Sequence, residues 1–439
     1  EAIGLTLSGN FSKEEFELNT QANLKINQLN NKGKSILKNK NIVLNTMLNV
    51  NQITNIYQIN KGEIAIEKLK FKLHGNIINK SLGVDLDIQS AGANIEIEEL
   101  FSLFPEKNKE VLAAYKTKGK ITFSCNIKGE LSAKKSPNLD AKFSIKKGAI
   151  TEKSSNISLT NLSVSGNFTN GKKNSIKSSQ LNLNDLNIDF GAGHISGNYV
   201  ISNFANPYIK IESKADIDIA TAKEFFKIDS LEIASGKLEI GFIYDGYIKE
   251  LRNIKATELR NLNAKGTAEL TNANLKLVEN DKHIKNINGR FKFNNNEIQI
   301  GDLKFELHKN QFELNGKFNN LLAFLFIEGE QLAVSTNFNS NKLVLDELLT
   351  KSEKEKSDEN YTIALPKNVT LNFSASIDTF QFRKFSATNF KGKIHLEDNL
   401  LTATHISFNA MKGLVIGEIA LDDSRPNEIL ITSKLKTEK

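Results

Sequence analysis

The sequence contains one cysteine, no tryptophan and five prolines among its 439 residues. With Cys125 alone, no intrachain disulfide can form, and cysteine usage leaves the compartment open because exported proteins can fold without disulfides. Cys125 alternates with Ile121, Phe123 and Ile127. This spacing is typical of a small buried side chain in a strand, so we do not expect a catalytic thiol.

Long apolar runs are also absent. The longest uninterrupted run covers residues 321–327, whereas a helix needs about 20 apolar residues to cross a bilayer. The chain begins at Glu1 without a methionine and shows no signal-peptide pattern. We therefore expect a fragment or processed form, preceded in the full protein by a targeting or anchoring segment.

Residues that carry chemistry form no catalytic or metal-binding pattern. The six histidines are scattered, and no pair has metal-ligand spacing on one element. Gly191, Ala192 and Gly193 lead into an expected strand rather than a helix, so the geometry that cradles phosphate is missing. No Gly-x-Ser-x-Gly elbow occurs. We expect no catalytic residue, no metal site, no cofactor and no enzymatic activity.

Arginine is scarce, with five positions, although the net charge is +7. Nucleic-acid binding relies on arginine for bidentate contacts to bases and phosphates, so nucleic acid is not an expected partner. The positive charge comes from lysines interleaved with Asp and Glu. Two interpretations remain, a solvated Lys-rich surface and weak attraction to anionic membrane surfaces.

The most informative feature that is present is a short strand with a glycine on its apolar side. It occurs four times, in residues 73–77, 195–199, 314–318 and 415–419. In each copy apolar residues lie two positions before and two positions after the glycine. The copies lie about 100 to 120 residues apart, which indicates a repeat architecture. A second glycine strand precedes three of them, in residues 164–168, 287–291 and 390–394.

Most of the remaining sequence alternates between apolar and polar residues with period two, which predicts half-buried strands. Short turns rich in Asn, Lys and Gly separate these runs and favour antiparallel neighbours. The alternation stops three times at a short helix-like run, near residues 97–101, 217–226 and 343–349. We predict repeat units that stack into one continuous elongated domain. Their bounds are residues 1–117, 118–230, 231–350 and 361–439, the last truncated, with a charged loop at 351–360.

Strands with one apolar face must cover that face. Two packed sheets forming a sandwich are one solution, and a single sheet curled around a trough is the other. A glycine inside a strand marks a sharp bend or the close approach of another group. We predict a mostly β fold, an elongated repeating antiparallel meander curled into an open hydrophobic groove with a short helix per repeat. The closed sandwich remains the alternative.

The strand and glycine pattern resembles the AsmA-like family, which includes TamB. Residues 398–401 (DNLL) and 412–422 (KGLVIGEIALD) are similar to the family's C-terminal pattern. Lys412-Gly413 stands where a Gly-Gly pair is usual, and Asp398-Asn399 stands where Asp-Gly is usual. Residues 209–226 resemble the strand followed by a short helix that recurs in the family.

This resemblance implies a non-enzymatic β-groove protein of the bacterial envelope, of the kind called a β-taco. It implies a periplasmic location and an inner-membrane anchor formed by a helix preceding Glu1. The implied function is a bridge that conducts phospholipids between the inner and outer membranes and supports outer-membrane biogenesis. The implied partners are phospholipid acyl chains, both membranes and outer-membrane assembly proteins. The alternative is a scaffold β-array that assists outer-membrane protein assembly without a bound lipid.

The expected groove lining comes from the apolar side of the alternating strands. The candidate residues are Leu73, Ile77, Ile121, Phe123, Val164, Phe168, Ile195, Tyr199, Leu238, Ile240, Phe291, Phe293, Phe312, Leu314, Phe318, Ile394, Val415 and Ile419. Burying one methylene contributes roughly 0.8 kcal/mol, so exposing both acyl chains of a phospholipid to water costs on the order of 20 kcal/mol. A continuous apolar trough would let the chains slide while the headgroup stays in water.

Overall fold

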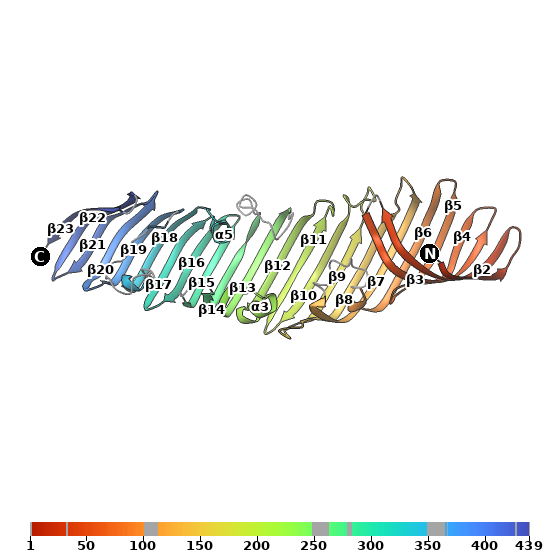
Figure 1. Cartoon of the computed structure of the whole chain (residues 1–439), viewed down its shortest axis with the longest axis horizontal. Coiled ribbons are helices and arrows are strands. Elements are labelled where there is room, and N and C mark those ends of the chain that lie inside the picture. The colour runs from red at the N-terminus through yellow and green to blue at the C-terminus, as the bar shows by residue number, and fades with distance from the viewer. Residues whose placement is uncertain are drawn as a thin grey trace. The chain divides into compact units, whose positions relative to one another are not determined.

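The computed structural model describes residues 2–31, 34–100, 113–247, 263–278, 283–348, 365–366, 368–425 and 428–438. Twenty-three strands and a few short helices lie in these residues (Figure 1). The chain divides into two compact units, unit 1 with Glu1–Ser213 and Asp245–Lys249, and unit 2 with Lys214–Tyr244 and Glu250–Lys439. The four repeats expected from the sequence stay a prediction, and the charged loop at 351–360 lies outside the described residues.

Unit 1 is an antiparallel meander in which each strand pairs with the next one in sequence from β1 to β11. Its strands are β1 (Ala2–Asn10), β2 (Glu15–Asn31), β3 (Lys34–Asn51), β4 (Ile56–Ile66), β5 (Leu69–Lys80), β6 (Gly83–Glu96), β7 (Tyr115–Ser132), β8 (Asn138–Glu152), β9 (Ser158–Thr169), β10 (Gln180–Phe190) and β11 (Gly193–Ser202). A short helix, α1 (Ile97–Leu100), follows β6.

Two strands, β12 (Tyr208–Asp218) and β13 (Leu231–Tyr247), carry residues of both units. The other strands of unit 2 are β14 (Ala264–Leu277), β15 (His283–Asn294), β16 (Glu297–Leu307), β17 (Asn310–Asn319), β18 (Leu332–Val344), β19 (Val369–Phe382), β20 (Phe385–Glu397), β21 (Leu400–Ala410), β22 (Gly413–Arg425) and β23 (Glu428–Glu438). From β13 onwards each strand pairs antiparallel with the next. The exception is β18 with β19, which are parallel.

The predicted mostly β antiparallel meander is therefore confirmed in both units. Within the described residues, β1 pairs only with β2 and β23 only with β22, so the sheet of each unit has an open edge at this strand. Strands β1 to β11 and strands β13 to β23 are hydrogen-bonded edge to edge with their neighbours in sequence. No described strand of either unit is left to form a second sheet across the apolar face, as the sandwich alternative requires.

Short helical turns occur at the three predicted places, as α1, as α3 (Ile219–Phe226) and as the 3-10 turn η2 (Leu345–Glu347). A further short helix, α5 (Leu321–Phe326), connects β17 to β18. In α3 the side chain of Asp218 accepts a hydrogen bond from the backbone N–H of Thr221 at 2.8 Å, which defines the N-cap. The helix ends at Lys227, which adopts a left-handed conformation.

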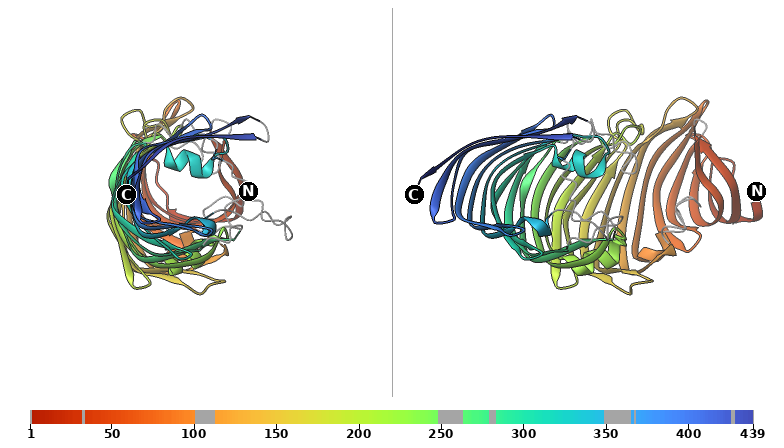
Figure 2. Two further views of the ribbon diagram at one scale, coloured as in Figure 1. Left: turned by 90° about the vertical axis from the view of Figure 1, so that its left-hand side faces the viewer. Right: turned by 60° about the vertical axis from the view of Figure 1, so that its left-hand side comes forward.

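Most strands bend at a β-bulge near their middle. Many of the register shifts between neighbours coincide with residues of positive φ, which are Asn94, Lys147, Asn161 and Asp185 in unit 1 and Asn272, Asn286, Asp302, Asn389 and His405 in unit 2. A bulge bends its strand and increases the local twist. Because the bulges lie on successive strands, the strands of each unit curve in the same direction (Figure 2).

The glycines of the four repeated strands lie against the backbone of the following strand. A Cβ added at Gly75, Gly197, Gly316 or Gly417 would lie 2.0 to 2.4 Å from a carbonyl oxygen of that strand. No side chain fits at such a distance. Of the two roles expected of such glycines, a sharp bend or the close approach of another group, these four have the close approach.

Candidate functional site

One face of the sheet in unit 1 is apolar, and we call it the apolar face of unit 1. Residues directly opposite one another on paired strands point to the same side of a sheet, so the strand register assigns the faces. One register row runs from β5 to β10 through Leu73, Ser90, Cys125, Ala141, Phe168 and Leu181. The candidate residues of unit 1, from Leu73 to Tyr199, all share this face.

Unit 2 has an apolar face of the same kind. A single register row crosses it from β13 to β22 through Ile240, Ala268, Phe291, Ile300, Gly316, Thr336, Phe373, Ile394, Ala403 and Ile419. All candidate residues of unit 2, from Leu238 to Ile419, lie on this face. None of the residues in these two rows carries a charge.

The side chains of both apolar faces are only partly covered. Of the candidate residues, Ile121, Val164 and Phe312 are buried, and the remaining ones are half-buried. In a sandwich core such side chains would be fully buried. Here they pack sideways against their neighbours within one layer, which leaves apolar surface open.

Aromatic rings line part of the apolar face of unit 2. The ring centroids of Phe305 and Phe312 lie 4.9 Å apart in a stacked arrangement. The row continues from Phe312 to Phe338 at 5.6 Å and from Phe338 to Phe373 at 6.0 Å. Of these four, only Phe312 is among the candidate residues named from the sequence, although the same alternation places the other three on the apolar side. The row spans β16 to β19.

Two polar groups on the apolar face of unit 1, the Tyr199 hydroxyl and the Cys125 thiol, are hydrogen-bonded or neutral. The Tyr199 hydroxyl lies 3.0 Å from Ser213 Oγ, which in turn donates to the Ser196 carbonyl at 3.0 Å. Cys125 is half-buried, and burial raises the pKa of its thiol, with a smaller contribution from Asp140. The thiol is therefore neutral near pH 7, which is compatible with an apolar surface.

The opposite face of the sheet is polar and charged. Cross-strand ion pairs occur there, such as Lys128 Nζ to Asp87 Oδ2 at 3.2 Å and Lys317 Nζ to Glu297 Oε1 at 3.3 Å. All four side chains are exposed to solvent. Exposed pairs of this kind contribute only about 0 to 1 kcal/mol each. They fit the interpretation of the lysines as a solvated surface.

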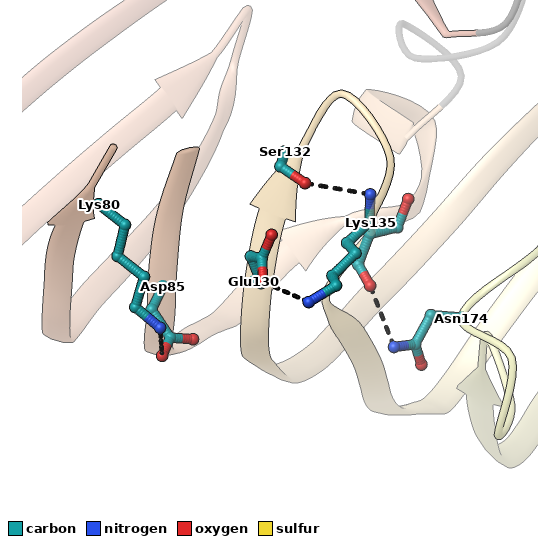
Figure 3. Close-up of polar contacts among 7 residues, drawn as sticks. Lys80, Asp85, Glu130, Ser132, Lys135 and Asn174 are labelled. Carbon is teal, nitrogen blue, oxygen red and sulfur yellow. Dashed lines mark hydrogen bonds and ion pairs between the residues drawn. The ribbon is translucent and has the colours of Figure 1, made fainter. Parts of the chain in front are cut away.

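Ion pairs also fix the strand ends on one edge of unit 1 (Figure 3). Lys80 Nζ lies 2.8 Å from Asp85 Oδ2, and this hydrogen bond raises the pKa of Lys80. Lys135 Nζ lies 2.7 Å from Glu130 Oε2 and holds the pKa of Glu130 below its usual range. Each acid at these strand ends is thus neutralised by a neighbouring lysine.

Hydrogen bonds connect the same edge from one turn to the next. The backbone N–H of Lys135 donates to Ser132 Oγ at 3.2 Å, which closes the connection between β7 and β8. Asn174 Nδ2, from the connection between β9 and β10, donates to the Ser136 carbonyl at 3.0 Å (Figure 3). The two connections therefore support each other.

Among the described residues, no group of three or more His, Cys, Asp and Glu side chains could hold a metal ion. Histidine takes part in surface contacts instead, as in the 2.9 Å contact between His194 Nδ1 and Asp189 Oδ1. No helix in the described part of the chain has the length and apolar character needed to cross a membrane. The apolar faces are thus the strongest candidate for a functional surface.

The resemblance to the AsmA-like family stays a prediction that rests on the residues quoted for it. Comparisons with protein-family models, with curated proteins and with solved structures find no match to this chain.

Proposed function

We propose that the apolar faces bind lipid acyl chains and that the protein is a non-enzymatic, lipid-conducting β-groove. The observation that carries this proposal is the uncharged row that crosses unit 2 from Ile240 to Ile419 without interruption. Its large side chains lie in a single layer and are half-buried, except Ile300, which is buried. A soluble protein seldom leaves so extended an apolar surface uncovered unless a ligand or partner covers it.

The row provides a path rather than a single pocket. Neighbouring strands lie about 4.8 Å apart, so an acyl chain running across the strands meets a new side chain at that interval. Each step along the row exchanges one set of apolar contacts for an equivalent set. Exposing both acyl chains to water at once would cost on the order of 20 kcal/mol, and movement along the row avoids this cost because the chains stay in apolar contact at every step.

The cellular setting of this function follows from the resemblance alone. We propose that the protein works in the periplasm of the bacterial envelope, anchored to the inner membrane. There it would pass phospholipids between the inner and outer membranes and support outer-membrane biogenesis. The alternative is a scaffold that assists outer-membrane protein assembly, in which the apolar faces bind no lipid.

Site-specific photocrosslinking separates these functions. Phe318 and Lys317 are neighbours on β17 that lie on opposite faces, the phenylalanine half-buried on the apolar face and the lysine exposed. We expect a photoreactive residue at 318 to form lipid adducts and one at 317 to form none. Phe293 and Lys292 on β15 provide a second matched pair. Absence of adducts at both phenylalanine positions in folded, membrane-derived protein would contradict the proposal.

Leu314→Lys tests the same surface without a probe. Leu314 is half-buried on the apolar face, so a lysine there can direct its ammonium group into solvent and leave the fold intact. We expect the variant to remain folded and to lose co-purifying lipid, measured by native mass spectrometry. Gln311→Lys, on the exposed face of the same strand, is the control and should keep its lipid. Unfolding of Leu314→Lys would instead indicate a closed core, since an unpaired buried charge costs several kcal/mol.

A further inference from the structure

One edge of unit 1 presents an exposed large apolar side chain at every connection. Because each strand runs antiparallel to the one before it, the connections after β1, β3, β5, β7, β9 and β11 all lie on the same edge. In these connections or at the strand ends beside them lie Phe11, Ile53, Leu82, Leu131, Ile176 and Phe204. Their exposed fractions range from 37% to 85%. We call these six side chains the apolar tips.

The opposite edge of unit 1 lacks this feature in its described residues. Its connections cover residues 67–68, 153–157 and 191–192 and the turn of α1. None of the described residues there is a large apolar side chain that is exposed, and Ile97 of α1 is buried. Single exposed apolar residues scattered over a surface are ordinary. Among the described residues of unit 1, one exposed large apolar side chain in every connection of a single edge is more regular than such scatter.

The same edge is basic. Its connections contain Lys13, Lys134, Lys135, Lys172, Lys173 and Lys177, all exposed. Glu14 is the only acidic residue within these connections. The nearby acids at the strand ends are Glu15, Asp85 and Glu130, of which Asp85 and Glu130 are paired with Lys80 and Lys135 (Figure 3). The edge therefore combines protruding apolar side chains with a net positive charge.

The connection that carries Ile176 is held by its own hydrogen bonds. Ser178 Oγ donates to the Asn170 carbonyl at 2.7 Å, and Ser179 Oγ donates to the Ser175 carbonyl at 2.9 Å. Asn170 Oδ1 accepts from the backbone N–H of Leu139 at 2.9 Å. Ile176 is thus exposed on an ordered turn rather than on a loose loop.

Two of the tips connect this edge to the apolar face. The Phe11 ring lies 5.2 Å from that of Phe16, and the Phe204 ring lies 5.9 Å from that of Phe168. Phe168 is on the apolar face of unit 1, and the register places Phe16 on the same side through Val50. The apolar surface therefore continues from the face to the edge.

We propose that this edge of unit 1 lies on an anionic lipid bilayer, with the apolar tips in the interfacial region and the lysines against lipid phosphates. Apolar side chains beside lysines are the combination that this region of a bilayer accommodates. Successive tips are about 10 Å apart, since two strand spacings separate them. A row of single side chains suits a fluid surface, whereas a protein interface requires a contiguous, shape-complementary patch. The proposal goes beyond acyl-chain binding by the apolar faces and does not depend on it.

Vesicle co-sedimentation of the full chain tests this proposal. We expect binding to vesicles of phosphatidylcholine mixed with phosphatidylglycerol and weaker binding to phosphatidylcholine alone. Raising the salt concentration should weaken only the binding to the anionic vesicles. The triple variant Ile53→Ser, Leu82→Ser, Ile176→Ser should bind roughly 10- to 100-fold more weakly. These three tips have no ring contact with the apolar face, so the variant should fold normally by circular dichroism.

Two further variants separate the apolar and charged contributions. Lys172→Gln with Lys173→Gln should reduce binding to the anionic vesicles about tenfold and leave binding to phosphatidylcholine little changed. Val43→Ser with Met47→Ser is the control, because it removes exposed apolar side chains from the polar face of β3 instead of the edge. This control should bind vesicles like the unaltered chain.

A second measurement distinguishes loss of vesicle binding by the edge from loss of acyl-chain binding by the apolar faces. Lipid that co-purifies with each variant is measured by mass spectrometry on the same samples. We expect the triple tip variant to keep this lipid and lose vesicle binding, and Leu314→Lys to do the reverse. Equal vesicle binding by the tip variant and the unaltered chain would overturn the proposal. So would absence of binding by the folded, unaltered chain, which would assign the edge to a protein partner.

Discussion

At the scale of single residues, glycine has two roles on the apolar faces. At Gly197 and Gly316 the backbone of the next strand occupies the space of a side chain, with a carbonyl oxygen 2.4 Å and 2.2 Å from an ideal Cβ position. At Gly166 the ring of Phe143, opposite on β8, covers the glycine. A glycine in a strand normally weakens it. Here backbone contact or an aromatic ring replaces the packing that the missing side chain would supply.

Gly316→Ala tests the first role. The new methyl group would meet the Ser335 carbonyl oxygen at 2.2 Å and Thr336 Cα at 2.5 Å, and neither can move without disturbing the pairing of β17 with β18. We expect a loss of about 2 kcal/mol or more in the free energy of unfolding, as for other overpacked sites. Denaturant unfolding followed by circular dichroism measures it.

Gly301→Ala on β16 is the matched control. A Cβ at Gly301 has its nearest neighbour, the Arg290 carbonyl oxygen, at 3.9 Å, an ordinary contact distance. This substitution should change the unfolding free energy by less than about 1 kcal/mol, the scale of surface changes. If both alanine variants were equally stable, the close approach would not be the reason for glycine at position 316.

At the scale of strands, asparagine side chains complete the hydrogen bonding of the bulges. The backbone N–H of Asn272 donates to Asn288 Oδ1 at 2.9 Å, and the carbonyl of Asn272 accepts from Asn274 Nδ2 at 3.3 Å. The next strand repeats this arrangement, since the N–H of Asn286 donates to Asn274 Oδ1 at 3.2 Å. A bulge interrupts the ladder and leaves backbone groups unpaired. The asparagines satisfy these groups, which accounts for part of the high Asn content.

Asn272→Val tests the backbone conformation of a bulge. Asn272 has φ 49° and its side chain is exposed, so substitution affects the backbone more than the packing. The left-handed region costs an L-residue roughly 1 to 2 kcal/mol, and a β-branched residue tolerates it least. We expect a loss of that size in the free energy of unfolding. Asn272→Gly should be nearly neutral, because glycine adopts this region freely.

The sequence predicted the strands and their apolar sides because alternation reports directly on exposure. It did not predict the bulges, although the signal is present around Asp185. Apolar residues occupy odd positions up to Leu183 and even positions from Leu186 onwards, and the register shifts between these two leucines. When strands are predicted from strict period-two alternation, a switch of the apolar residues from odd to even positions indicates the end of a strand. Here it marks a bend within one.

Other features depend on contacts that no local pattern encodes. β18 and β19 pair in parallel, yet their residues alternate between apolar and polar as in an antiparallel pair. Alternation in the sequence therefore does not distinguish parallel from antiparallel pairing. The choice between a trough and a sandwich depends on whether a second sheet covers the apolar face, which is a long-range property. The candidate residues of each unit share one face because face assignment requires only local parity. Their exposure became evident from the pairing of whole strands.

At the scale of the whole molecule, both units are built from contacts between neighbours in sequence. Each strand from β2 to β10 pairs with the strand before it and the strand after it, and so does each strand from β14 to β22. Arrays of this kind have stabilities close to a sum of local terms and nearest-neighbour interfaces. A local defect should then open a few strands rather than the whole chain.

Hydrogen exchange of Gly316→Ala tests this locality. The alanine disturbs the pairing of β17 with β18, and β16 is the other neighbour of β17. We expect faster amide exchange in β16 to β18 and unchanged protection in β5 to β9 of unit 1, because sub-global opening follows cooperative units. A uniform rise in exchange across both units would contradict the prediction and show that the chain unfolds as a single cooperative block. A local response would also mean that a defect in one unit leaves the apolar face of the other unit intact.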